Sequence, residues 1–569
     1  MKRKLTANKG GAALLLAGLL ALPVSACSGG TNSKATARAD ELKPAAVEAV
    51  KLNSPVKGSN DAWSLPNADL QNTRSIASGI TKKNVASLKP AWTIDLKGTG
   101  YFGSMICNPV FSPDGKFVYV QDLSNNVFAV NVETGKVLWE YDVPASASNG
   151  LGPNGVTYYE GKVYGETNSD AFALDAKTGR RVWVTPNLAE KTGQGFNIQP
   201  QANDGKIFIS TSGQLHGGVA YALDAKTGKV LWEFQETKNP DEREVGGEAG
   251  TGGAWNAAAI GPKGDVLFGI ANPYRSIEQA IEHPTKLLYN DSTVSLNPDT
   301  GKLNWYFQAI PNDFQDWDMH ISPIYVRQPS VRPMILGSGK MGFVYALNPQ
   351  TGKLIWKTSV GIHNGHDNDS QLALEGKFKY PPLPYTFYPG TLGGVETNMA
   401  VADGMVFVPV TNGSSTLSSY QETIPSFPQG GNGELVAISL KTGKIVWDHK
   451  LATPLYGDAT VSNGIVYATE FAGNVMAFDA KTGKELWKAK LPAGSNSPIA
   501  ITGDYLIVPA GYPMEDGQTA QLVAYKVGYT GEPVRSVQAG SKTPKKAATE
   551  PTWYRAAQKF TPAQGKPGN

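Results

Sequence analysis

The stretch AFALDAKTGRRVW, from Ala171 to Trp183, is one of two near-identical copies of the pattern that decides the fold; the other is AYALDAKTGKVLW, from Ala220 to Trp232. Each copy predicts a β-hairpin, because a short apolar run leads through a polar Thr-Gly turn into an alternating run that places the tryptophan on a buried face. Gly179 supplies the positive φ angle that such a turn requires. Five further copies of the pattern end at Trp139, Trp305, Trp356, Trp447 and Trp487.

The spacing of these copies predicts a repeat architecture. The turn glycines lie at positions 135, 179, 228, 301, 352, 443 and 483, so that intervals of 40–51 residues separate most of them. A unit of about 40–50 residues with several short strands is typical of a β-propeller blade. The two longer intervals, of 73 and 91 residues, must contain insertions.

An eighth blade can be assembled from the two ends of the repeat region. Ala91 to Leu96 (AWTIDL) reads as a closing strand with nothing before it to complete a blade. Ser497 to Gly511 and Gln521 to Gly528 supply about three strands without a tryptophan strand. Pairing them closes the ring and removes exposed sheet edges. We therefore predict an all-β, eight-bladed propeller, in which Thr81 to Leu88 is the clearest helical segment.

Composition narrows the function only slightly. A length of 569 residues alone would suggest about three or four domains, but one propeller accounts for most of this chain. The net charge of +3 does not indicate a nucleic-acid partner. Cys27 and Cys107 form no disulfide framework once the leader is set apart. The sequence contains no CxxCH, which excludes a covalently attached c-type haem.

The N-terminus predicts export. Residues 1–26 combine a basic start with the apolar stretch Ala12 to Pro23, as in a signal peptide; that stretch is too short to span a bilayer. The position of Cys27 resembles the lipobox of bacterial lipoproteins, which implies lipidation of Cys27 and attachment to a membrane. Ordinary secretion with an incidental cysteine is the alternative. The expected location is the cell envelope: the outer face of the cell membrane, the periplasm or an outer membrane.

The rest of the chain divides by composition. Residues 27–60 are rich in Ser, Thr, Ala and Lys and predict a flexible tether. The propeller is expected to span residues 61–530. Residues 531–569 are rich in Lys, Pro and Gly and predict a disordered tail.

Beyond the repeat, the chain resembles the eight-bladed quinoprotein alcohol dehydrogenases, which use pyrroloquinoline quinone (PQQ). The repeat is similar to the tryptophan-docking motif of that family, and Asn67 to Leu96 is similar to its N-terminal segment. The resemblance covers roughly residues 60–530. The repeat alone says little about chemistry, because non-enzymatic propellers such as outer-membrane assembly lipoproteins share it.

The resemblance implies roles for four residues. Trp255, in GTGGAWNAAA, stands where the family stacks a tryptophan on PQQ, and Asn272, in GIANPYRS, stands where it has an asparagine that binds Ca²⁺. Asp318, in QDWDMHISP, matches the catalytic base, which also approaches the metal. Lys340, in GSGKMGFVYALN, matches a basic residue near the quinone oxygens. Such a site needs an aromatic floor, a cation for the quinone oxygens, a Lewis acid and a carboxylate base.

Each of these residues also has an ordinary structural interpretation. Trp255 could be a further core tryptophan, and Asn272 could form a turn before Pro273. Lys340 on its own would be a surface lysine. Asp316 and Asp318 could be solvated loop carboxylates, or Asp316 could be the base if the register is shifted by two residues.

Three positions depart from the family pattern. Ser148-Asn149 stands in place of a vicinal cysteine pair. Asn154 stands in place of an arginine that contacts a PQQ carboxylate. Gln214 or Leu215 stands in place of a glutamate that binds Ca²⁺; Gln214 could still contact the metal and cofactor through its amide oxygen. Glu244 and Glu248, in a glycine-rich loop, are candidates to supply the missing charge.

The insertion from Ile362 to Gly394 is long enough to be functional, and we expect it to line the substrate entrance. It contains four residues of metal-ligand type, but its glycine and asparagine content favours a solvated loop; these residues are His363, His366, Asp367 and Asp369.

Two functional hypotheses follow. The first is an exported, lipid-anchored dehydrogenase that oxidises an alcohol or sugar with PQQ and Ca²⁺ and passes electrons to a separate acceptor, a cytochrome or the quinone pool. The second is a non-catalytic propeller lipoprotein that binds a partner in the cell envelope. The first requires the four family-matched residues to converge at one end of the axial channel; these are Trp255, Asn272, Asp318 and Lys340.

Overall fold

The computed structural model describes residues 63–538 except 99, 101, 144–154, 191–193, 214–215, 238–250, 330 and 427–429. The chain divides into two compact units, Met1–Val56 and Lys57–Asn569, and every described residue belongs to the second. The predicted signal peptide, tether and most of the tail therefore lie outside the described residues. So do several positions discussed above: Cys27, Ser148, Asn149, Asn154, Gln214, Leu215, Glu244 and Glu248.

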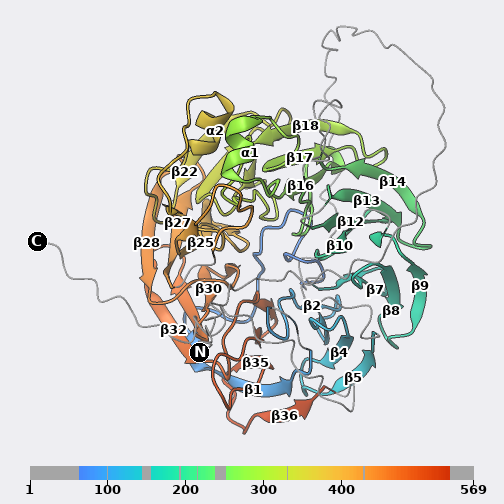
Figure 1. Ribbon diagram of the computed structural model, residues 1–569. Coiled ribbons are helices and arrows are strands. Elements are labelled where there is room, and N and C mark those ends of the chain that lie inside the picture. Colours follow the sequence, from blue (N-terminus) through green and yellow to red (C-terminus); the bar gives the residue numbers. More distant parts are fainter. Residues whose placement is uncertain are drawn as a thin grey trace, which may run out of the picture. The chain divides into compact units, whose positions relative to one another are not determined.

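The described part of the second unit forms a ring of eight sheets, as predicted, and their strands are antiparallel except for one pair in the last sheet (Figure 1). We number the sheets as blades in chain order, each running from an inner to an outer strand. Blade 1 comprises β2 (Val110–Phe111), β3 (Phe117–Gln121), β4 (Val127–Asn131) and β5 (Val137–Tyr141), and blade 2 comprises β6 (Thr157–Tyr159), β7 (Lys162–Glu166), β8 (Ala171–Asp175) and β9 (Arg181–Thr185). Blade 3 comprises β10 (Gly195–Phe196), β11 (Gln201–Asn203), β12 (Lys206–Ser212), β13 (Val219–Asp224) and β14 (Val230–Gln235). Blade 4 comprises β15 (Ala259–Ile260), β16 (Val266–Ile270), β17 (Ser292–Leu296) and β18 (Leu303–Gln308).

The remaining blades follow the same order. Blade 5 comprises β19 (Ile324–Val326), β20 (Met334–Gly337), β21 (Phe343–Leu347) and β22 (Leu354–Ser359), and blade 6 comprises β24 (Ala400–Ala402), β25 (Met405–Asn412), β27 (Asn432–Ser439) and β28 (Ile445–Leu451). Blade 7 comprises β29 (Thr460–Ser462), β30 (Ile465–Glu470), β31 (Asn474–Asp479) and β32 (Glu485–Lys490). Blade 8 comprises β33 (Ala500–Thr502), β34 (Tyr505–Ala510), β35 (Gln521–Val527), β1 (Leu88–Asp95) and β36 (Val534–Val537).

The ring closes as predicted, because β1 from the N-terminal side pairs antiparallel with β35 from the C-terminal side. Two details of the prediction were wrong. β36 pairs in parallel with β1, so the propeller extends beyond residue 530. The expected helix at Thr81 to Leu88 is only a 3₁₀ turn, η1 (Val85–Ser87), and Leu88 begins β1. Pro90 keeps Lys89 out of helical geometry, so the turn cannot continue far beyond Leu88.

The repeated pattern joins each blade to the next. In six copies the tryptophan indole N–H donates to a backbone carbonyl in the following blade; Trp139, for example, donates to Ala176 at 3.1 Å. Trp92 of β1 makes the same bond to blade 1, and Trp487 contacts Tyr525 of blade 8 edge-on. The ring of Trp139 also lies against Gly179, where a Cβ atom would be 2.5 Å from it. Gly179 has a φ of 68°. The turn glycine is therefore required both for its backbone conformation and for the space that the tryptophan occupies.

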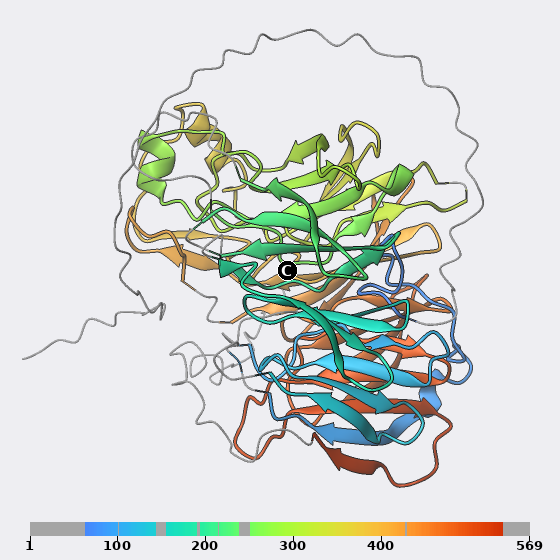
Figure 2. The same cartoon turned by 90° about the vertical axis from the view of Figure 1, so that its right-hand side faces the viewer.

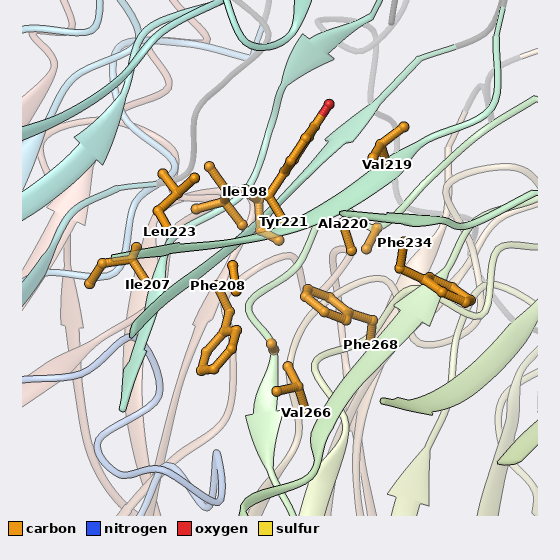
Figure 3. Close-up of a cluster of buried hydrophobic side chains, with 14 of the residues drawn as sticks. Ile198, Ile207, Phe208, Val219, Ala220, Tyr221, Leu223, Phe234, Val266 and Phe268 are labelled. Carbon is orange, nitrogen blue, oxygen red and sulfur yellow. The ribbon is translucent and has the colours of Figure 1, made fainter. Parts of the chain in front are cut away.

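Apolar side chains fill the space between neighbouring blades. Figure 3 shows one such cluster, in which Phe208 of blade 3 lies on the same side as Val266 and Phe268 of blade 4, whereas Tyr221 points to the opposite side of blade 3. All four are at most 2 % exposed. The alternation of each strand places these residues on the faces between blades.

The N-terminal segment 63–80 crosses the centre of the ring and bonds to every blade. Backbone N–H groups from the innermost strands of six blades donate to its carbonyls; the donors are Phe111, Tyr158, Ile260, Tyr325, Val401 and Val461. Gly79 donates to Gly503 in blade 8, and Gln201 of blade 3 lies 3.5 Å from Asn72. Arg74 is fully buried and pairs with Asp458 at 3.1 Å. This segment holds the inner ends of the blades in place.

The two long insertions pack together at one edge of the ring. α1 (Ile277–Glu282) and α2 (Asp369–Leu374) lie side by side there, as Figures 1 and 2 show. A two-stranded ribbon of β23 (Tyr385–Phe387) and β26 (Ser415–Leu417) lies in the same region, and a second 3₁₀ turn, η4 (Pro262–Gly264), precedes β16. No helix in the described part of the chain is long and apolar enough to cross a membrane.

Candidate active site

The four residues that the first hypothesis requires come together on blades 4 and 5. Trp255 lies before β15 and Asn272 after β16, whereas Asp318 lies before β19 and Lys340 after β20. In a propeller these connections gather at the same end of the ring. The contacts below join all four residues, so the predicted convergence is confirmed.

Asn272 holds two carboxylates together. Its backbone N–H donates to Asp318 Oδ1 at 2.8 Å, and its side-chain Nδ2 donates to Asp318 Oδ1 at 2.6 Å and to Asp316 Oδ1 at 2.5 Å. Its own Oδ1 accepts a bond from the Tyr274 backbone at 2.6 Å. Asn272 therefore forms a turn and belongs to the site at the same time.

Lys340 is a buried member of the site. Its Nζ lies 2.7 Å from Asp318 Oδ2 and 3.2 Å from Asp316 Oδ2, and its side chain is 7 % exposed. The surface interpretation of Lys340 and the solvated-loop interpretation of Asp316 and Asp318 are therefore wrong. Lys340 Nζ also lies 5.9 Å from the centre of the Trp255 ring, within the range of a cation–π interaction.

The sequence analysis missed a fifth residue, His320. Its imidazole stacks on Trp255 with the ring centres 4.0 Å apart and the planes 5° from parallel. His320 is fully buried. Its position two residues after Asp318 is the signal that could have identified it, because alternate residues of an extended segment share a side.

Charge and burial give the two carboxylates different acidities. Burial raises the pKa of Asp316 to about 8. Burial acts on Asp318 in the same sense and is the largest single effect, but Lys340, His320 and the hydrogen bond from Asn272 together outweigh it and hold the pKa of Asp318 below its ordinary value. Burial likewise opposes the charge of Lys340, but Asp316 and Asp318 raise its pKa well above the ordinary value. At neutral pH the site therefore holds an ionised Asp318 beside a charged Lys340.

Further acidic groups surround this pair, and the sequence analysis predicted none of them. Both carboxylate oxygens of Asp291 are buried without a hydrogen-bond partner among the described residues, as is Oε2 of Glu396. Burial raises the pKa of Glu396 to about 8 and that of Asp291 well above its ordinary value. Both groups also interact electrostatically with Asp316, Asp318 and Lys340. Acidic groups thus outnumber the single lysine.

This donor set fits a hard cation. Carboxylate and amide oxygens are the ligands that Ca²⁺ prefers, and the unpartnered oxygens of Asp291 and Glu396 show that the site carries uncompensated acceptors. In the described part of the chain no three His, Cys, Asp or Glu side chains converge closely enough to hold a metal by themselves. A bound ion would therefore need further ligands. For Asn272 to be one of them, its amide would have to turn so that Oδ1, which now accepts from Tyr274, faces the carboxylates in place of Nδ2. The partly exposed face of Trp255 fits a flat ring.

The insertion from Ile362 to Gly394 supports the loop that carries the carboxylates. The indole of Trp317 donates to the Pro389 carbonyl at 2.9 Å, and Phe314 packs on Tyr385 with ring centres 6.0 Å apart. A role at the substrate entrance stays a prediction.

The histidines of this insertion form local pairs and are not fully solvated. His363 lies 2.7 Å from Asp367, and His366 lies 2.8 Å from Asp369. The His363 and His366 side chains are 13 % and 32 % exposed, respectively.

Two family models match the chain. The first, described as the glucose/ethanol/alcohol dehydrogenase β-propeller domain, matches residues 63–360, which include Trp255, Asn272, Asp318 and Lys340. The second, described as the outer membrane protein assembly factor BamB, matches residues 431–552.

Curated relatives point to the same family as the first model. The chain is 27 % identical to the quinoprotein alcohol dehydrogenase PedH of Pseudomonas putida, over 78 % of this chain and 85 % of PedH. It is 26 % identical to a quinoprotein ethanol dehydrogenase of P. putida, with the same coverage.

Solved structures show the same fold. The quinohemoprotein alcohol dehydrogenase ADHIIG of P. putida matches with a TM-score of 0.72 and 21 % identity, over 86 % of this chain and 83 % of that one. The enzyme of Comamonas testosteroni matches with a TM-score of 0.72 and 22 % identity, over 84 % and 82 %. With a family model that covers more than half of its length and carries its site residues, this chain belongs to the PQQ family of glucose, ethanol and alcohol dehydrogenase β-propellers.

Proposed function

We propose that this protein is an exported oxidoreductase that oxidises a hydroxyl group of an alcohol or sugar with PQQ and a bound metal ion, and passes the electrons to a separate acceptor. The observation that carries the proposal is the convergence of Trp255, Asn272, Asp318 and Lys340 in one buried site. The relatives named above as alcohol and ethanol dehydrogenases support this substrate class.

Asp318 would act as the general base. Lys340, His320 and Asn272 together hold its pKa below the ordinary value, so the carboxylate is ionised at neutral pH and can accept the hydroxyl proton. Asn272 and Lys340 fix the carboxylate through Oδ1 and Oδ2 respectively, which leaves it a single orientation. Asp316, with a pKa of about 8, would retain its proton at neutral pH and so would not compete as a base.

Trp255 would stack against PQQ, and Lys340 would lie near the quinone oxygens. PQQ, when bound, would accept the hydride equivalent from the substrate carbon. Asp318 and Asn272 would hold the metal ion, for which Ca²⁺ is our proposal; the buried oxygens of Asp291 and Glu396 that lack a hydrogen-bond partner among the described residues support it. Asn154 and Gln214 are proposed to contact the cofactor, and Gln214 also the metal.

Export and anchoring are a separate part of the proposal. The basic and apolar leader and the position of Cys27 support a lipoprotein held in the cell envelope. The electron acceptor would then be a cytochrome or the quinone pool, since the chain carries no haem attachment motif.

The alternative is a non-catalytic scaffold in the cell envelope. The match of the BamB model to residues 431–552 favours it. That region does not include blades 4 and 5, where the site residues lie. Binding a partner as a scaffold does not require a buried cluster of ionisable groups around a partly exposed tryptophan, whereas such clusters are typical of catalytic sites. The dehydrogenase is therefore the stronger proposal.

Reconstitution tests the proposed function. The purified protein would be incubated with PQQ and Ca²⁺, and reduction of an artificial dye acceptor would be followed with a panel of primary alcohols, secondary alcohols and sugars. The proposal expects dye reduction that requires PQQ and disappears in Asp318→Asn. If no member of the panel reduces the dye although PQQ binds, the proposed reaction is wrong.

A further inference from the structure

The stacked pair of His320 and Trp255 is the part of the site that the mechanism above does not use. The two residues come from the loops that lead into successive blades, Trp255 before β15 and His320 before β19. Their ring centres are 4.0 Å apart, and the planes differ by 5°. His320 is fully buried whereas Trp255 is partly exposed. The imidazole therefore covers the interior side of the indole.

His320 is itself fixed from several directions. Its Nε2 lies 3.0 Å from the backbone carbonyl of Glu396 and its Nδ1 lies 3.4 Å from that of Asp318, so both ring nitrogens face carbonyl acceptors. The next residue, Ile321, donates its N–H to the Ser338 carbonyl at 3.3 Å. On the other side, the backbone of this segment packs on Gly269, where a Cβ atom would lie 2.5 Å from the Met319 carbonyl oxygen. The imidazole is thus held by neighbouring blades and not only by its own loop.

A buried polar network connects this segment to the central N-terminal segment. Asn398 accepts the Ser322 backbone N–H at 3.0 Å and donates to Asp458 at 2.8 Å. Asp458 in turn pairs with Arg74. Asn67 donates to the Ser322 hydroxyl at 3.1 Å. The loop that carries His320 therefore rests on the segment that joins all the blades, which gives the histidine a rigid support.

We propose that His320 is a positioning residue that fixes the plane of Trp255, so that the indole forms a preformed floor for a flat heteroaromatic ligand. This inference rests on the proposed function for the identity of that ligand. An unsupported indole would change rotamer, and binding would have to restrict that motion. A parallel aromatic neighbour removes this freedom before the ligand arrives.

A set of three variants isolates this role. His320→Ala removes the supporting ring, and His320→Phe restores an aromatic ring without the imidazole nitrogens. His449→Ala is the matched control, because His449 of β28 packs against another aromatic ring, that of Phe478 at 4.7 Å, in a different part of the propeller. The thermal midpoint of each variant would be measured to establish that it is folded.

The first readout needs no cofactor. Hydroxyl-radical footprinting followed by trypsin gives the peptide from Glu244 to Lys263, in which Trp255 is the only aromatic residue and no sulfur-containing residue is present. We expect faster oxidation of this peptide in His320→Ala, and a wild-type rate in His320→Phe and His449→Ala. An unchanged rate in His320→Ala would overturn the positioning role.

The second readout is PQQ affinity, measured by calorimetry in the presence of Ca²⁺. We expect about five- to tenfold weaker binding in His320→Ala, with recovery in His320→Phe. Equal weakening in both variants would overturn the proposal, because the imidazole nitrogens and not the ring face would then matter. If the wild-type protein does not bind PQQ, the proposed function fails and so does the ligand named here, whereas the footprint still decides whether His320 fixes Trp255.

Discussion

Asp316 and Asp318 share both of their strongest partners: Asn272 Nδ2 bridges their Oδ1 atoms at 2.5 and 2.6 Å, and Lys340 Nζ bridges their Oδ2 atoms at 3.2 and 2.7 Å. Two carboxylates held so close cannot both ionise easily, and Lys340 is nearer to Asp318. Burial raises the pKa of Asp316 to about 8, and the neighbouring Asp318 adds to the rise, whereas Lys340, His320 and Asn272 together outweigh burial and lower the pKa of Asp318. This difference is what assigns the base to Asp318.

The assignment predicts unequal effects of two conservative substitutions. Asp318→Asn should lower the turnover of the reconstituted enzyme by about 10²–10⁴-fold, because a neutral amide cannot accept the hydroxyl proton. Asp316→Asn should lower it by at most about tenfold, since Asp316 is already protonated at neutral pH. Dye-coupled turnover measures both. The opposite ranking would make Asp316 the base.

Lys340 should contribute to stability as well as to chemistry. Lys340→Gln leaves the buried, ionised Asp318 without its cation, and we expect it to lower the free energy of unfolding by about 3 kcal/mol. Added Ca²⁺ should restore more stability in this variant than in the wild type. Urea unfolding with and without Ca²⁺ measures this, and Lys340→Arg, which keeps the charge, is the control. A Ca²⁺ response that does not differ between Lys340→Gln and the wild type would argue against a cation site here.

The turn glycines offer a matched test of the packing between blades. Gly179→Ala adds a Cβ atom 2.5 Å from the ring of Trp139, whereas at Gly205 no other described atom lies within 4 Å. Both glycines have a φ near 70°, so both variants should lose about 1 kcal/mol from backbone strain. We expect Gly179→Ala to lose a further 1–3 kcal/mol, roughly, from displacement of the tryptophan. Equal losses in thermal or urea unfolding would contradict the docking account.

Glu236 predicts a pH-dependent loss of stability. It is fully buried, and burial raises its pKa from an ordinary 4.5 to about 8. Its contribution to the free energy of unfolding is therefore complete below pH 4.5 and is lost as the pH rises through 8. Between these values the unfolded chain releases the Glu236 proton whereas the folded protein keeps it, so a rise in pH favours unfolding.

Glu236→Gln should remove this decline. We expect the variant to unfold at about the same temperature as the wild type at pH 5 and at a higher temperature at pH 8. Asp204→Asn, on a mostly exposed carboxylate, is the control and should leave the pH profile unchanged. A parallel decline in Glu236→Gln and the wild type would show that Glu236 does not keep its proton on folding.

The repeat made the fold predictable from the sequence. The Thr-Gly turn before a tryptophan encodes both a hairpin and its docking on the next blade, so each copy specifies the same local structure. Ring closure could be predicted because Ala91 to Leu96 reads as a closing strand with no strands before it to complete its blade. β36 was missed because its four residues stand in a stretch rich in Lys, Pro and Gly, where composition hides a short strand.

The site was only partly predictable, for a physical reason. Trp255, Asn272, Asp318 and Lys340 were found through motifs that keep their order along the chain. Asp291 and Glu396 belong to no such motif, and His320, although it lies in the same stretch as Asp318, matches no role that the resemblance implies. The importance of all three comes from burial and from neighbours that are distant in sequence. Asn154 and Gln214 lie outside the described residues, so their roles stay predictions.

The central claim is that the propeller binds PQQ on Trp255 with the help of a cation. Calorimetric titration of the protein from about residue 60 onwards with PQQ, with and without Ca²⁺, tests it most directly, with Trp255→Ala as the second sample. The account predicts binding that strengthens with Ca²⁺ and is lost in the Trp255→Ala variant. No binding at high micromolar PQQ, or equal binding by the variant, would contradict it.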